Sequence, residues 1–151
     1  MLAAIFSALH LIGLGIGLGA VWMRGRALRA EARTPDAVQR ILVADNFWGI
    51  AALLWIGTGL VRVLGGLDKA TDFYVHNGFF RVKMSAVMIL LALEMWPMIT
   101  FIRWRVARAR GGVPDTSHTA ALSRINDGEL ALVVVIVFLA AMMARGLWLL
   151  P

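Results

Sequence analysis

The sequence predicts an all-α integral membrane protein, a bundle of four transmembrane helices with both chain ends on the outer side of the membrane. Three observations lead to this prediction. Of the 151 residues, 60% are hydrophobic and the mean hydropathy is +0.78, whereas a soluble domain of this length is closer to half apolar. Four long runs carry hardly any charge, and arginine collects in two of the three segments between them.

The apolar runs place the helices at about residues 2–23, 47–64, 79–102 and 128–148. Each run approaches or exceeds the ~20 residues that cross a ~30 Å hydrocarbon core. The connecting segments are too short to form a soluble domain. We therefore expect residues 1–151 to form one transmembrane domain.

Arginine distribution predicts the orientation of the helices. Residues 24–40 hold five arginines and residues 103–127 hold five more, whereas residues 65–78 hold a single lysine balanced by two aspartates. The positive-inside rule places the two arginine-rich segments in the cytoplasm, which is an N-out/C-out topology. This topology also explains the net charge of +6, so the charge does not indicate a nucleic-acid partner.

The first helix carries one histidine among apolar residues. The helix begins without a basic region and basic residues follow it, so we expect it to be retained rather than cleaved as a signal peptide. His10 lies near its middle, and Gly13 and Gly17 follow on the same face. Glycines four residues apart favour close packing against another helix. They could instead open a groove beside the imidazole, whose nitrogens need polar partners in hydrocarbon.

The second helix carries Trp48 and Trp55 seven residues apart, which is typical of core packing. Arg62 follows near the outer end, where anchoring at the membrane interface explains a lone arginine. Gly65 and Gly66 then end the helix.

The third helix is expected to begin after Asn77 and to be kinked at Pro97. Lys83 and Glu94 are eleven residues apart and share one face, separated by ~16 Å of helical rise. Lys83 lies near the outer end, where it can extend to the interface. Glu94 lies deeper, so it is protonated, paired or facing a wet cavity.

A stripe of methionines also follows the third helix. Core packing is the expected use of these side chains, because methionine fills irregular gaps. A Cu(I) path, or a methionine as the second ligand of an iron atom, is the alternative. The stripe consists of Met84, Met88, Met95 and Met98.

The fourth helix is expected to begin at Asn126 and Asp127, which offer an N-cap. The inner ends of the last three helices carry acids, namely Asp45, Glu94, Asp127 and Glu129. No cysteine is present, which excludes disulfides and thiolate ligands. His76 and His118 fall in connecting segments and are expected to be solvated.

These positions suit a haem. We expect His10 to be the metal ligand of haem b, with the ring lying over Gly13 and Gly17. The two propionates would then point outward, toward cations. The cations around the outer mouth are Arg62, Arg81 and Lys83.

The chain resembles bacterial membrane proteins of the domain of unknown function numbered 2214 over essentially its full length. That resemblance implies a multi-pass protein of the bacterial cytoplasmic (inner) membrane and carries no function. The resembling stretches are ALHL at 8–11, ADNFWG at 44–49, WIGTGL at 55–60, LEMWPM at 93–98 and RINDGE at 124–129.

More distantly, the chain resembles HemJ-type protoporphyrinogen oxidases and CopD-like membrane proteins. The resemblance rests on His10, on Gly59 followed by leucine, on Lys83, and on residues 124–127. It implies haem b on His10 and Lys83 holding the carboxylates of a porphyrinogen. In a haem redox protein, Glu94 or Asp127 would be the catalytic groups that transfer protons. Where that family carries a second histidine this chain has Glu94, which leaves the second axial ligand open.

Three functions are compatible with these residues. The first is a haem b redox protein with cytochrome-like electron transfer to or from a quinone, and the second is a porphyrinogen oxidase proper. The third is a membrane protein without haem, such as a copper-handling or assembly factor, in which His10 only packs. The lipid bilayer is the expected partner, and a homo-oligomer could complete a haem site that one small bundle leaves open.

Overall fold

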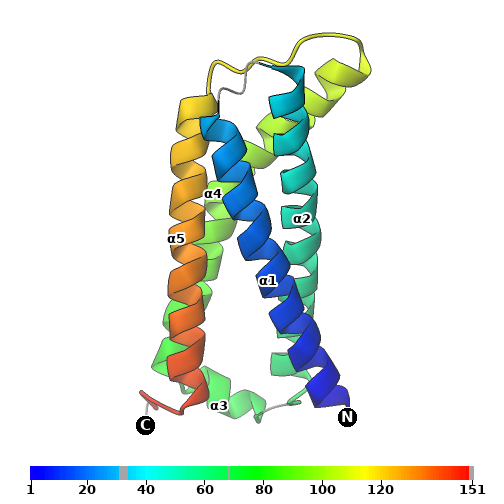
Figure 1. Cartoon of the computed structure of the whole chain (residues 1–151). Helices are drawn as coiled ribbons and strands as arrows, with labels where there is room; N and C mark the ends of the chain where they lie inside the picture. Colours follow the sequence, from blue (N-terminus) through cyan, green and yellow to red (C-terminus); the bar gives the residue numbers. More distant parts are fainter. Residues whose placement is uncertain (31–33, 68, 150–151) are drawn as a thin grey trace.

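The computed structural model describes residues 1–30, 34–67 and 69–149, which are helical almost throughout (Figure 1). Four long helices run antiparallel in chain order, and the five-residue helix α3 (Thr71–Val75) lies between the second and third of them. All four are long and apolar enough to cross a membrane. The predicted all-α fold with four transmembrane helices is confirmed. The long helices are α1 (Leu2–Arg29), α2 (Pro35–Leu64), α4 (Gly78–Ala109) and α5 (Thr119–Ala144).

We call the end of the bundle with the α1–α2 and α4–α5 connections the inner end, after the predicted orientation. The opposite end, which carries Met1, α3 and residues 145–149, is the outer end (Figure 1). The long helices have 26 to 32 residues, or about 39–48 Å of helical rise. They exceed the ~30 Å hydrocarbon core, so their ends reach the interfacial layers.

The helix ends differ from the sequence prediction mainly on the inner side. α1 and α4 continue to residues 29 and 109, and α2 begins at residue 35. An apolar run marks only the part of a helix that lies in hydrocarbon, whereas arginine and glutamine are good helix formers and prolong it. α5 begins at Thr119, so the expected N-cap at Asn126 and Asp127 is wrong, because both lie inside the helix.

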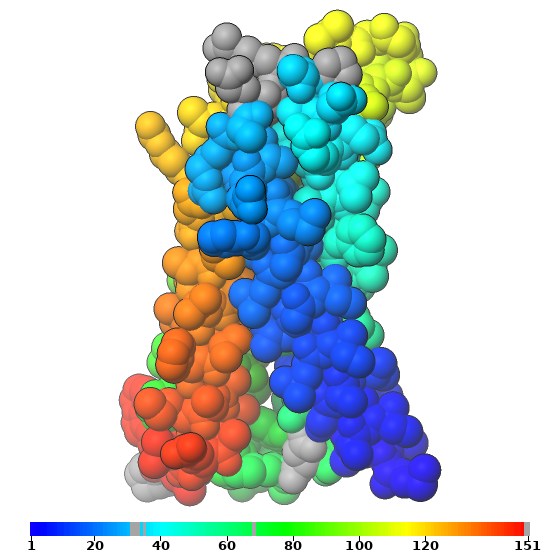
Figure 2. Space-filling model, in the orientation of Figure 1, coloured from blue at the N-terminus to red at the C-terminus, as the bar shows by residue number. Residues whose placement is uncertain are grey.

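The bundle consists of two helix pairs. α1 packs against α2 and α4 packs against α5, while contacts between α1 and α5 join the pairs and α2 scarcely touches α4. Figure 1 shows α1 and α5 close together at the inner end and separating toward the outer end. On the surface, green residues of the α3–α4 region are visible between their outer halves (Figure 2). The two pairs therefore converge inward and splay outward.

The inner end is the better packed. One apolar cluster joins α1, α2, α4 and α5 there, and it includes Leu28, Ile41, Phe101, Trp104 and Leu122. Trp104 also donates from Nε1 to the backbone oxygen of Asp115, at 2.8 Å, which fastens α4 to the following loop. A second cluster around Val21, Trp48 and Leu90 fills the middle of the bundle.

Asn77 organises the outer end. Its side chain accepts a hydrogen bond from the Phe80 N–H and so begins α4, as the sequence predicts. Its amide also donates to the Leu147 oxygen at 3.0 Å, and the Gly78 N–H donates to the Trp148 oxygen. These bonds hold the segment after α5 against the start of α4.

Candidate functional site

Arg24, near the inner end of α1, is a fully buried charged residue. It is 0% exposed, and each of its five N–H groups has an acceptor. Nε donates to Asn126 at 2.8 Å, and the two terminal nitrogens donate to Glu94 in a bidentate pair at 3.0 and 2.9 Å. The remaining two hydrogens reach Asp45 and Glu129. A guanidinium offers five donors in a fixed plane, and this site uses them all.

The acceptors come from the other three long helices. Asp45 lies on α2, Glu94 on α4, and Asn126 and Glu129 on α5. Their carboxylates are 12%, 17% and 0% exposed, in the order Asp45, Glu94, Glu129. We call Arg24 and these three acids the ion cluster. Both helix pairs meet at this cluster. In a membrane, apolar side chains alone give a helix no preference for one partner helix over another.

Neighbouring donors hold the acids in place. Trp48 donates from Nε1 to Glu94 at 2.9 Å, and Arg105 donates to Asp45 at 2.8 Å. Asn126 donates to the Val21 carbonyl at 3.0 Å, which fixes its amide so that its oxygen faces Arg24. Arg105 is expected from the sequence to be a loop residue, but it lies in α4 and belongs to this network.

The charges of the ion cluster and of its neighbour Arg105 do not cancel. Arg24 and Arg105 supply two positive charges against the three carboxylates, so one negative charge is in excess when all three acids are ionised. One oxygen of Glu129, Oε1, is buried without a hydrogen-bond partner among the described residues. An unpaired charge away from water is costly, and uptake of one proton removes that cost. The cluster can therefore bind a proton.

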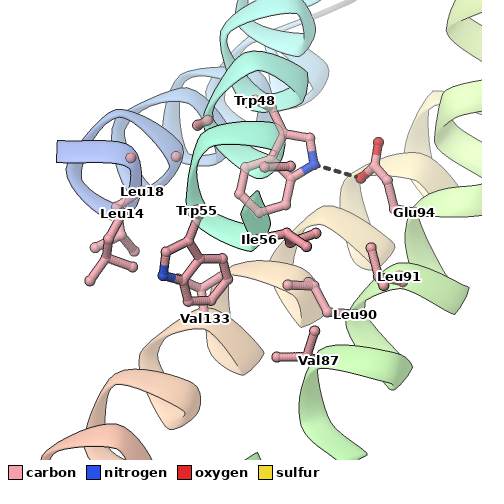
Figure 3. Close-up of a pocket in the computed structure, with 14 residues that line it drawn as sticks. Leu14, Leu18, Trp48, Trp55, Ile56, Val87, Leu90, Leu91, Glu94 and Val133 are labelled. Atoms are coloured by element: carbon pink, nitrogen blue, oxygen red, sulfur yellow. Dashed lines mark hydrogen bonds between the residues drawn. The ribbon is translucent and has the colours of Figure 1, made fainter. Parts of the chain in front are cut away.

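A narrow cavity adjoins the ion cluster on its outer side (Figure 3). It lies between the two helix pairs, and its empty space, open mouth included, is about 510 Å³, of which about 50 Å³ has room for the centres of water-sized molecules. Its walls are apolar, with Trp48 and Trp55 on the α2 side and Leu90 on α4. Glu94 is the one ionisable residue in the wall, and Figure 3 shows Trp48 reaching across to it. The cavity thus connects directly to the ion cluster.

His10 lies in the seam between α1 and α2 and is not in the wall of this cavity. Its Nδ1 is 2.9 Å from Thr58 Oγ1, and its ring is 5.9 Å from that of Trp55. The single hydroxyl hydrogen of Thr58 is directed to the Leu54 carbonyl, at 2.6 Å. The Thr58 oxygen therefore accepts from His10 Nδ1–H, which leaves Nε2 as the nitrogen with the lone pair.

Gly13 and Gly17, which follow His10 in α1, contact α2. A Cβ on Gly13 would lie 3.2 Å from the Trp55 backbone nitrogen, and one on Gly17 would lie 3.4 Å from Trp48 and Ala51. These glycines therefore serve close helix packing, one of the two uses that their spacing allows. α2 occupies the space on this side of the glycines, and the expectation of a haem ring over them stays a prediction. Both glycines still border the cavity on its α1 side.

The outer cations are only partly gathered. Lys83 is half-buried, lies over the Phe80 ring at 5.1 Å, and is close enough to Arg62 for the two charges to repel. No carboxylate of the described residues lies within ion-pair distance of Lys83. Arg81 instead donates to the Val75 carbonyl and is exposed. Two of the three expected cations, Arg62 and Lys83, thus lie together.

Asp127 is not part of the cluster. It forms an exposed ion pair with Arg29, and the acid that faces Arg24 from α5 is Glu129, two residues further along the chain. Two residues on a helix differ by about 200° in direction, which separates the surface from the core. Of the two acids expected to transfer protons, Glu94 thus lies in the cluster and Asp127 at the surface, and a role for Asp127 stays a prediction.

Arg24 itself is the residue that the sequence analysis overlooks, because it counts among the loop arginines. A signal was nevertheless present. The inner ends of the last three predicted helices each carry an acid, and a buried set of carboxylates requires a cation at the same depth. Arg24 is the first arginine after the apolar run of α1, so it is the residue at that depth.

No group of three or more histidine, aspartate or glutamate side chains in residues 1–30, 34–67 and 69–149 could hold a metal ion. In the ion cluster the guanidinium of Arg24 takes the central position. The methionine stripe does not pack in the core, since Met84, Met88, Met95 and Met98 are 38% to 62% exposed. These methionines lie on an exposed apolar face of α4, which borders the lipid.

The chain belongs to the family described as "Predicted membrane protein (DUF2214)", whose profile matches residues 2–147. The match covers nearly the whole chain and agrees with the resemblance that the sequence shows. It identifies a multi-pass membrane protein and names no activity. Comparison with curated proteins and with solved structures gives no significant match.

Proposed function

We propose that this membrane protein binds a flat, apolar molecule of the quinone class between its two helix pairs and holds its oxygen by a hydrogen bond from a protonated Glu94. The observation that carries the proposal is the double position of Glu94. It belongs both to the wall of the apolar cavity and to the buried ion cluster.

The cavity supports this class of ligand by its chemistry. Ligand sites are mostly apolar and carry a few polar groups that fix orientation. Here two indole rings, Trp48 and Trp55, offer flat faces, and the only ionisable group is at the inner end. A quinone has the matching shape, an apolar ring with a carbonyl oxygen at its edge that accepts a hydrogen bond.

Glu94 is suited to holding a proton by its surroundings. It receives two hydrogen bonds from Arg24 and one from Trp48, so its position is fixed. Glu129 lies on the same Arg24 nitrogen and has an oxygen without a partner among the described residues. A proton taken by the cluster can therefore reside on either acid, one at the cavity and one behind it.

The test uses the protein in lipid nanodiscs and the quenching of tryptophan fluorescence by a short-chain benzoquinone. The cavity signal is the quenching that the wild type shows and the Trp48→Phe variant does not. We expect Leu90→Trp, which fills the cavity, to weaken this quenching about tenfold, and the milder Ala52→Leu to weaken it less. Ile89→Trp is the matched control, because Ile89 neighbours Leu90 but is 53% exposed to lipid. Equal quenching in Leu90→Trp and Ile89→Trp would refute the cavity as the site.

Protonation of Glu94 is tested separately, with a pH indicator in weakly buffered solution. Wild-type protein is expected to take up protons when the benzoquinone binds, and Glu94→Gln is expected to abolish that change. Binding without any proton change in the wild type would leave a ligand site but end the role of Glu94.

A second candidate function is favoured by the environment of His10. Thr58 holds the imidazole with Nε2 as its lone-pair nitrogen, the arrangement usual for metal-ligating histidine. Lys83 and Arg62 lie together near the outer end, where the propionates of a haem b ligated by His10 would find them. A bound haem supplies one-electron redox chemistry. Because α2 covers Gly13 and Gly17, the ring would have to occupy another side of His10.

The absorption spectrum tests this candidate. Protein purified from haem-replete cells is expected to show a Soret band, which His10→Ala removes and His76→Ala and His118→Ala retain. Lys83→Glu should loosen the haem more than Arg103→Glu, an exposed change of equal charge in α4. Colourless wild-type protein would eliminate the haem and leave the quinone proposal intact.

A further inference from the structure

A second hollow lies on the outside of the bundle at the inner end, where α1 and α2 run side by side (Figure 1). It is an open groove with about 910 Å³ of empty space. Its walls include Trp22, Met23 and Arg26 from α1, and Arg40 and Val43 from α2. It is separate from the cavity beside Glu94, since the two share no residue.

Among the residues that the structure describes, the groove contains two arginines and no acid. Arg26 and Arg40 are both exposed, and neither forms a hydrogen bond or an ion pair with another described residue. This contrasts with Arg24, Arg29, Arg105 and Arg108, which all bond to acidic or amide side chains. Two unpaired guanidinium groups in one groove form a site for an anion, and phosphate matches their geometry best.

Apolar and charged residues follow a fixed order along the groove. Arg26 is the fourth residue from the end of α1 and Arg40 is the sixth residue of α2, so the two lie at similar depth, about one to two turns from the connection. Trp22 and Val43 lie about one turn deeper in the membrane on the same faces, and they are 52% and 38% exposed. The order is therefore cations at the interface and apolar side chains in the hydrocarbon.

We propose that this groove binds a phospholipid with an anionic headgroup from the inner leaflet. Arg26 and Arg40 contact the phosphate, Gln39 offers an amide to the headgroup, and an acyl chain lies along Trp22 and Val43. A free phosphate ion would satisfy the arginines but would leave the apolar half of the groove uncovered. The site does not depend on the function proposed for the cavity.

The experiment measures how much lipid stays with the purified protein. The full chain is extracted in mild detergent and mixed with phosphatidylglycerol or phosphatidylcholine, and bound lipid is counted by native mass spectrometry. Each interfacial arginine strengthens binding to anionic lipid by about fivefold. We therefore expect Arg26→Gln/Arg40→Gln to weaken phosphatidylglycerol retention by about 25-fold. The control Arg103→Gln/Arg110→Gln removes the same charge from exposed positions of α4 and its C-cap, and it should change retention less than threefold.

A second measurement places the lipid in the groove. Phosphatidylglycerol with a brominated acyl chain is expected to quench the tryptophan signal that disappears in Trp22→Phe, and the double arginine variant should lose that quenching. Soluble glycerol phosphate is expected not to compete at equal concentration.

Three results would overturn the proposal. One is equal retention by the Arg26/Arg40 variant and its control, and another is retention of phosphatidylcholine as strong as that of phosphatidylglycerol. The third is competition by glycerol phosphate as effective as that by lipid, which would assign the arginines to a free phosphate ion. If the double variant unfolds, the single variants Arg26→Gln and Arg40→Gln decide, each with an expected loss of about fivefold.

Discussion

The inner and outer halves of the bundle use polar residues in opposite ways. In the inner half each long helix contributes a side chain to one ion cluster, and Arg24 satisfies four partners at once. In the outer half the described hydrogen bond between side chains of two long helices, His10 with Thr58, stays within one helix pair, and the pairs stand apart. Helices in a membrane gain little from apolar contact alone. The ion cluster therefore explains why the pairs converge inward, and its absence in the outer half explains the room for a cavity.

The largest test of this comparison is all-or-none and concerns which half faces the cytoplasm. A reporter that is active only in the cytoplasm should work when inserted at Gly112 and fail when fused after residue 151. The reason is the excess of arginine in the two inner connections. If only the fusion after residue 151 were active, the inner end of the bundle would face outward, and the proposed lipid would come from the opposite leaflet.

The next effect in size is the loss of Arg24. Arg24→Gln leaves three carboxylates buried around a neutral amide, and breaking a buried ion pair typically costs ~3–5 kcal/mol. The free energy of unfolding can be measured by SDS titration followed by circular dichroism. Arg103→Gln, an exposed change in α4, should shift it by less than ~0.5 kcal/mol. Adding Glu129→Gln to Arg24→Gln should restore part of the loss, because one of the unpaired charges is gone.

A smaller effect distinguishes the two faces of α1 in the outer half. Gly13→Ala places a methyl group 3.2 Å from the Trp55 backbone nitrogen and 3.3 Å from Leu54. Overpacking of this kind costs ~1–3 kcal/mol. Gly15→Ala meets no atom within 4 Å and should stabilise the helix by up to ~1 kcal/mol. Equal effects of the two changes would show that the α1–α2 seam is not tightly packed.

The smallest effect is expected at Asp127. Its ion pair with Arg29 is exposed, at 46% for the arginine and 51% for the aspartate, and such pairs contribute ~0–1 kcal/mol. Asp127→Asn should therefore leave both unfolding and quenching by benzoquinone nearly unchanged. A large loss of quenching in this variant would return Asp127 to the functional site.

The sequence by itself determined the membrane environment, the number of long helices and the outer helix ends. These follow from local properties, since an apolar run of ~20 residues has one stable environment and residues such as Asn77 act on their own neighbours. It also indicated that Glu94 is not a lone carboxylate in hydrocarbon, because a charge at that depth is costly alone. What the sequence indicated for Glu94 was a choice among three states, and the structure selects pairing beside a cavity.

Only the tertiary structure decided which residues form the site. Arg24 and Glu129 are 105 positions apart, and although Arg24 is the first arginine after the apolar run, no local pattern shows that it faces inward while Arg26 and Arg29 do not. Their difference is rotation about the helix axis, which points one toward Glu94, another toward the lipid groove and the third toward Asp127. In the same way the spacing of Gly13 and Gly17 permits either helix packing or a cofactor. The position of α2 decides for packing on the side that it contacts, because its atoms occupy the space beside both glycines.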